Sequence, residues 1–93
     1  MVIFEDDDDE YLGWLDRHPH GFVINSTRPA SASYLVLHAA QCTTIRGRPT
    51  RGTYWTRDYV KVCAETTDAL QAWARREFGS AAKACERCAP AAG

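Results

Sequence analysis

Residues 59–79 read YVKVCAETTDALQAWARREFG, which is a strand pattern followed directly by a helix pattern. Apolar and polar side chains alternate over Tyr59–Ala64, and this period of two predicts a strand. Thr66 or Thr67 can cap the helix that follows, because a threonine hydroxyl accepts a hydrogen bond from a free N–H of the first turn. Gly79 predicts the end of that helix, since glycine readily adopts the left-handed conformation found there.

The sequence before this stretch predicts one more helix and two more strands. An acidic helix start and an apolar stripe predict a helix over about Asp7–Arg17. Asp6 or Asp7 can serve as its N-cap, and acidic side chains are favoured at the positive end of the helix dipole. The apolar runs Phe22–Asn25 and Tyr34–His38 predict an antiparallel strand pair, with loops at residues 26–33 and 43–53. We therefore expect an α+β fold, consisting of a small antiparallel sheet of three or four strands with two main helices.

Length and composition limit the class of protein. The 93 residues predict a single domain, and 45% hydrophobic with 25% charged residues is ordinary globular composition. The core of so short a chain is thin and often needs a disulfide, a metal or a partner. No apolar run approaches the ~20 residues of a membrane span, and the acidic start does not resemble a secretory signal. We therefore expect no membrane partner and, by default, a cytoplasmic protein.

Three cysteines and a histidine have the spacing of a metal site. Cys85 and Cys88 form a C-x-x-C pair, which lets two thiolates reach one metal from a tight turn. His38 and Cys42 supply a second close pair as His-x-x-x-Cys. The sequence therefore predicts a Cys3His zinc site, a common closed tetrahedral set that would stabilise the α+β fold.

The cysteine pattern leaves several alternatives open. Cys63 competes with His38 for the fourth ligand position, although its place inside a strand favours a packed thiol. Disulfides are less favoured without a secretory signal, and unligated free thiols at an exposed C-x-x-C would be prone to oxidation. A thioredoxin-like role is weak, because the C-x-x-C follows a helix instead of opening one.

Charge is distributed unevenly along the chain. Residues 1–16 carry seven acids and no Lys or Arg, which predicts either a solvated helix start or an acidic arm that screens a basic face from wrong partners. The same segment could also contact a protein partner. Residues 43–61 instead interleave cations with aromatic side chains, a composition that suits phosphate contact and base stacking. The alternative is a solvated loop whose Trp55 packs on the core. The predicted nucleic-acid-binding residues are Arg46, Arg48, Arg51, Tyr54, Trp55, Arg57 and Lys61.

Three segments resemble a known family in the same order. LHAAQCTTI (37–45), YVKVCAETTDALQAW (59–73) and KACERCAP (83–90) resemble the metal-binding domain of Ada-type DNA alkylation-repair proteins. The resemblance divides the chain into an N-terminal helix and strand at 1–33 and an Ada-like zinc module at 34–90. It implies His38, Cys42, Cys85 and Cys88 as ligands, with Cys63 outside the set, and it implies the DNA backbone as partner.

One ligand position departs from the family pattern. In the repair proteins the first ligand is a cysteine whose zinc-bound thiolate accepts a methyl group from a DNA phosphotriester, and here that position is His38. A metal-bound imidazole has no lone pair left for attack on a methyl carbon. We therefore expect a non-catalytic zinc-binding module that recognises nucleic acid. The alternatives are a protein-interaction module that uses the acidic N-terminal helix and, less favoured, a methyl-accepting repair domain.

Overall fold

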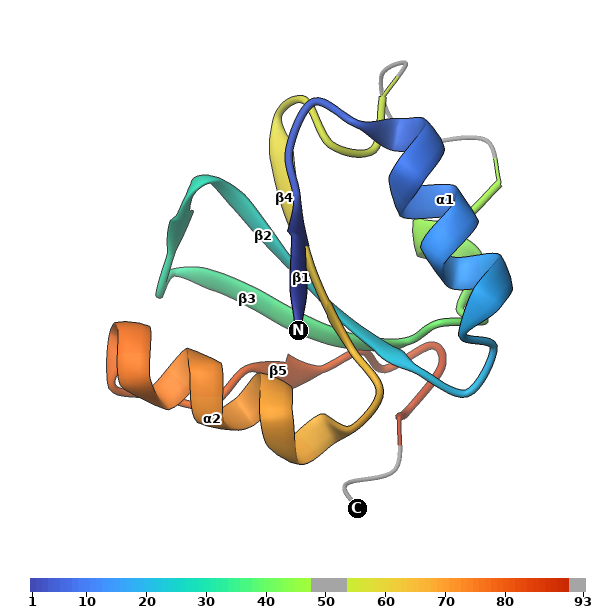
Figure 1. The fold of residues 1–93 in the computed structure, drawn as a ribbon. Helices are drawn as coiled ribbons and strands as arrows, with labels where there is room; N and C mark the ends of the chain where they lie inside the picture. Colours follow the sequence, from blue (N-terminus) through green and yellow to red (C-terminus); the bar gives the residue numbers. More distant parts are fainter. Residues whose placement is uncertain (48–53, 91–93) are drawn as a thin grey trace.

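The computed structural model describes residues 1–47 and 54–90 and has the predicted α+β class (Figure 1). Helices and strands alternate irregularly along the chain. The elements are β1 (Val2–Phe4), α1 (Asp8–Arg17), β2 (Phe22–Ser31), β3 (Tyr34–Ala39), a 3-10 helix η1 (Thr43–Ile45), β4 (Tyr59–Ala64), α2 (Thr67–Phe78) and β5 (Lys83–Ala84).

The sheet differs from the expected antiparallel sheet of three or four strands. It has five strands in the order β1-β4-β2-β3-β5, and β5 runs parallel to β3, so the sheet is mixed. The two added strands lie at the edges and have three and two residues, too few to give a periodic pattern. The backbone N–H of Cys85 extends the β3–β5 pairing by donating to the carbonyl of Leu37 at 2.8 Å.

Strand β2 is the centre of the sheet. It pairs antiparallel with β3 on one side and with β4 on the other, so Val23 lies opposite both His38 and Cys63. The prediction of a loop at residues 26–33 was wrong for its first part, because β2 continues to Ser31. The buried Ser26 hydroxyl donates to the carbonyl of Tyr34 at 2.7 Å, so a polar side chain joins β2 to the start of β3.

Both helices begin at their predicted caps. The Asp7 side chain accepts a hydrogen bond from the N–H of Glu10 at 3.2 Å, and the Thr66 side chain accepts one from Ala69, also at 3.2 Å. Gly79 ends α2 with φ +74°, the left-handed region that its lack of a Cβ permits. Local capping interactions therefore set the start of α1, the start of α2 and the end of α2.

The two helices pack on opposite faces of the sheet, because neighbouring residues of β4 belong to different clusters. Val62 lies in the cluster under α2, together with Ile24, Leu35, Leu37, Leu70 and Trp73. Cys63 lies in the cluster under α1, together with Phe4, Tyr11, Trp14, Leu15 and Val23. The structure is thus a central sheet with one helix on each face (Figure 1).

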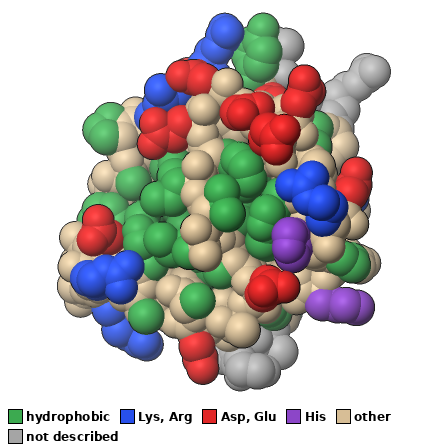
Figure 2. Space-filling view, in the orientation of Figure 1, with side chains coloured by type: hydrophobic (Ala, Val, Ile, Leu, Met, Phe, Trp, Pro, Cys, Tyr) green, Lys and Arg blue, Asp and Glu red, His purple; other side chains and the backbone are tan. Residues whose placement is uncertain are grey.

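The surface view shows how charge and apolar side chains are distributed over one side of the molecule. Apolar side chains gather in the middle of this side, and acidic side chains gather above them near the start of α1 (Figure 2). Val2 and Ile3 of β1 are among the exposed apolar residues. Neither α1 nor α2, the two α-helices of the described part of the chain, is long and apolar enough to cross a membrane.

Candidate metal centre

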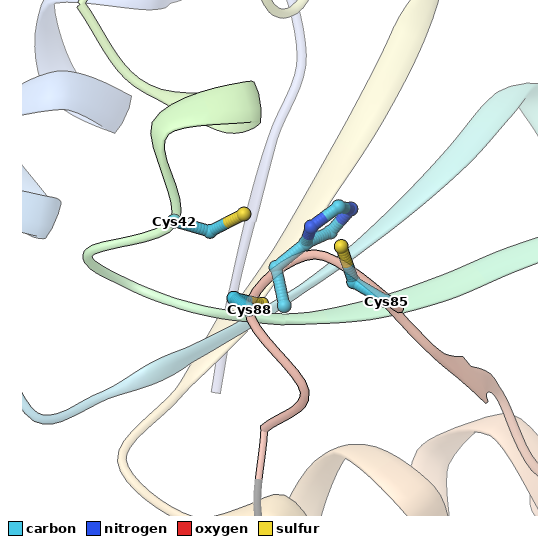
Figure 3. Close-up of side chains that lie close together, drawn as sticks. Cys42, Cys85 and Cys88 are labelled. Carbon is cyan, nitrogen blue, oxygen red and sulfur yellow. The ribbon is translucent and has the colours of Figure 1, made fainter.

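The structure brings together four side chains that could hold a metal ion. Their ligand atoms all lie within 4.8 Å of one another, and they belong to His38, Cys42, Cys85 and Cys88. A tetrahedral zinc with bonds of about 2.0 to 2.3 Å would space such atoms about 3.5 Å apart. The three cysteine side chains point into the same space from two segments of the chain (Figure 3).

Backbone pairing explains why these residues meet. His38 is near the end of β3, and Cys42 follows after a turn in which its N–H donates to the carbonyl of Ala39 at 3.0 Å. Cys85 comes directly after β5, which pairs in parallel with β3. The turn that contains Cys88 closes when the N–H of Ala89 donates to the carbonyl of Cys85 at 2.8 Å. The β3–β5 pairing therefore brings the two halves of the cluster together.

The His38 ring fits the role of a ligand. Its Nδ1 atom is buried and has no hydrogen-bond partner among the described residues. Buried polar atoms are almost always paired, so an orphaned nitrogen in a ring that clusters with three thiols indicates a missing partner. Burial, with a smaller contribution from the Lys61 charge, lowers the pKa of His38 to about 4. The ring is therefore neutral at pH 7, the form that binds metals.

The thiols are surrounded by groups that stabilise a sulfur ligand. Burial alone would raise the pKa of Cys85, but hydrogen bonds from the backbone N–H groups of Cys88 and Arg87, together with those of the Cys88 and Cys42 thiols, outweigh it and hold that pKa below its ordinary value. The N–H of Ala39 donates to the Cys88 sulfur at 3.4 Å. Burial nevertheless raises the pKa of Cys88, with neighbouring sulfurs adding to the effect. A metal cation among the sulfurs would offset the repulsion between neighbouring thiolates that contributes to this raised pKa.

Cys63 lies outside the cluster. It is fully buried on the α1 side of the sheet, where burial raises its pKa to about 12. All four cysteines are free, so no disulfide links them. Among the predicted alternatives, the arrangement therefore favours His38 as the fourth ligand and Cys63 as a packed thiol.

The predicted nucleic-acid-binding residues are placed in different environments. Arg46 pairs with Asp16 at 2.8 Å, and the guanidinium of Arg57 lies 3.9 Å from the centre of the Tyr54 ring. Arg48 and Arg51 lie outside the described residues. The exposed aromatic side chain in this segment is Tyr54.

Trp55 and Lys61 are inside the molecule. Trp55 packs in the α1-side cluster, and the Lys61 side chain is only 1% exposed. The Lys61 ammonium donates to the Oδ1 atom of Asn25 and to the carbonyl of Trp55, both at 2.7 Å. The prediction that both are surface contact residues was therefore wrong, and what remains accessible of them lines a cavity.

Sequence reasoning missed the structural role of the acidic segment. The Asp8 carboxylate accepts hydrogen bonds from the N–H groups of Trp55 and Thr56, each at 2.8 Å, and from the Thr56 hydroxyl at 2.6 Å. Asp6 pairs with Arg28 at 2.7 Å. No local signal could have shown these interactions, because the partners are separated by 22 to 48 positions in the sequence. Part of the acidic segment therefore fixes the fold.

Comparisons with protein families, curated proteins and solved structures find no match to this chain. The site must therefore be interpreted from its own geometry.

Proposed function

We propose that this chain is a non-catalytic zinc-binding module that recognises nucleic acid through the DNA backbone. The observation that carries the zinc assignment is the convergence of three thiols with the His38 ring, whose buried Nδ1 atom has no described hydrogen-bond partner. Zinc prefers this combination of sulfur and nitrogen donors in closed tetrahedral sites. The resemblance of residues 34–90 to the Ada-type domain supports the same ligand set.

The absence of a catalytic step is inferred from the donor at position 38. When the His38 nitrogen holds the metal, it has no lone pair with which to accept an alkyl group. The three thiolates of Cys42, Cys85 and Cys88 would together complete the coordination shell of the same ion. A closed four-ligand site supplies folding free energy and leaves no open position for substrate.

The proposal of a nucleic-acid partner rests on the segment beside the centre. Arg57 is exposed and forms no ion pair among residues 1–47 and 54–90, and its guanidinium lies over the exposed Tyr54 ring. The buried Lys61 ammonium donates to the carbonyl of Trp55 and so holds this segment in place. A cation stacked on an aromatic ring suits a phosphate with an adjacent base or sugar.

A salt titration tests this partner. Removal of a cation that binds one phosphate should reduce the slope of log affinity against log salt by roughly 0.7 to 0.9. We expect Arg48→Gln with Arg51→Gln and, separately, Arg57→Gln to weaken DNA binding and flatten the slope. The matched control is Arg75→Gln with Arg76→Gln on α2, which removes the same charge from another part of the surface.

Equal effects of the test and control variants would show that the binding is nonspecific, and no binding at physiological salt would overturn the proposal.

The alternative function is a protein partner that binds the acidic helix. It is less favoured because Asp6 and Asp8 are held by internal contacts, which leaves less negative charge for a partner. That alternative predicts that the arginine variants bind like wild type, whereas Asp9→Asn with Glu10→Gln abolishes binding of a protein partner.

A further inference from the structure

A cavity of about 420 Å³ lies beside the metal centre. Its lining includes Asn25, Tyr34, Tyr59 and Lys61 from the sheet, and Tyr54 from the segment before β4. The metal ligand His38 lines it as well. This size is within the range of pockets that bind small molecules or parts of larger ones.

Two side chains of this cavity, Lys61 and Asn25, have hydrogen-bond donors without a described partner. The Lys61 ammonium has three N–H donors, and two of them donate to Asn25 Oδ1 and the Trp55 carbonyl, so the third lacks a partner among the described residues. Because an ammonium can only donate, it fixes the Asn25 amide with its oxygen toward Lys61. The Asn25 NH2 group then has no described partner of its own. The cavity therefore favours a ligand with acceptor oxygens.

Aromatic rings supply the rest of the recognition surface. The Tyr34 and Tyr59 ring centres are 5.9 Å apart, and the Lys61 ammonium lies 5.4 Å from the Tyr59 ring centre. Tyr34 and Tyr54 are 40% and 46% exposed, so ring area remains available to a ligand. A planar ligand could pack on these rings while its oxygen faces the donors.

From this combination we propose that the cavity binds one unpaired nucleobase of a DNA strand, with a base carbonyl oxygen facing Lys61 and Asn25. The inference rests on the proposed nucleic-acid function and adds a base contact to it. Thymine fits these groups because it is planar and has two carbonyl oxygens. Arg57, stacked on Tyr54, is placed to contact a phosphate of the same strand.

The test compares two single strands of equal length and equal charge, oligothymidine and an abasic strand, on the zinc-loaded full chain. We expect oligothymidine to bind about tenfold or more tightly, the size of one base-stacking interaction. Tyr34→Ala with Tyr54→Ala should remove this difference. The controls Tyr34→Phe and Tyr54→Phe keep the rings and should keep it. Circular dichroism and metal content establish that each variant is folded.

The outcomes separate the two proposals. Salt-dependent binding of equal strength to both strands would overturn the base contact and leave the proposed function intact. No binding of either strand would overturn both. A preference for oligothymidine that survives the double alanine variant would place the base elsewhere and overturn the assignment to this cavity.

Discussion

The two faces of the sheet are covered by helices of similar length but are stabilised by different interactions. Under α2, Leu70 and Trp73 pack against apolar side chains of β2, β3 and β4. On the α1 side, the buried set also includes His38, Thr56 and Lys61, which are polar or ionisable. The α2 side buries mainly apolar area, with Ser26 and Thr67 as its buried polar residues, whereas the α1 side also buries ionisable side chains and, we propose, a metal.

The two faces should respond differently to substitution. Burial of apolar area tolerates small changes of shape, but a buried polar group destabilises the fold when its partner is removed. The residues of the candidate metal centre connect β3 to the chain after β5, at the edge of the sheet where β5 contributes only two residues. The proposed zinc would therefore stabilise this edge of the sheet, whereas the apolar cluster stabilises the face that α2 covers.

Removal of the metal ligands should have the largest effect. Cys85→Ser with Cys88→Ser should abolish metal binding and cooperative unfolding, because a structural zinc supplies on the order of 10 kcal/mol. Thermal unfolding and metal analysis measure both effects. The control Cys63→Ser should retain the metal and lose only packing. If Cys63→Ser lost the metal and His38→Ala kept it, the fourth ligand would be Cys63.

Truncation of the α2 face comes next. Trp73→Ala should lower the free energy of unfolding by about 3 to 5 kcal/mol, because it leaves a cavity in the apolar cluster. Denaturant titration of the metal-loaded chain measures this loss. The stoichiometry of metal binding should not change, and loss of the metal together with stability would show that the two faces are not independent.

A smaller effect is expected for the acidic anchor. Asp8→Ala should cost about 2 kcal/mol, because three donors of Trp55 and Thr56 lose their acceptor. Asp9→Ala is the matched control, since Asp9 is exposed and lies one residue further along the helix. Urea titration of both variants should show a clear loss for Asp8 alone, and equal losses would refute the anchoring role.

The Asp8 contribution should also depend on pH. Burial alone would raise the pKa of Asp8, but hydrogen bonds from Thr56 and Trp55 outweigh it and hold the pKa below its ordinary value. A lowered pKa stabilises the fold above the unfolded value of about 3.9 and loses that contribution as the pH falls through the folded value. The stability difference between wild type and Asp8→Ala should therefore shrink below about pH 4.

The smallest predicted effect concerns the end of α2. Gly79→Ala should cost about 1 kcal/mol, because alanine at φ +74° is in the left-handed region. No neighbouring atom of the described residues lies within 4 Å of the added Cβ, so backbone conformation alone sets the cost. Denaturant titration of this variant should show a loss of that size, and an unchanged midpoint would contradict the capping role.

Local patterns predicted the elements that local chemistry determines. The caps Asp7 and Thr66, the end at Gly79 and the strand Tyr59–Ala64 agree with the structure. The four clustered ligand residues also followed from spacing, since His-x-x-x-Cys and C-x-x-C each place two donors within reach of one ion.

Features that depend on long-range contacts could not be predicted in this way. Strand β5 has too few residues for a pattern, and its parallel direction follows from pairing with β3. Lys61 belongs to a basic segment in the sequence, yet alternation along β4 places it inside with Cys63. Its partner Asn25 is far away in the sequence, so only the sheet register reveals their contact.

The most direct test of the zinc assignment is the metal content of the purified full chain at neutral pH. We predict one zinc ion per chain, released by a strong chelator together with the loss of folded structure. A well-ordered, metal-free chain that unfolds cooperatively and does not respond to added zinc would contradict the account.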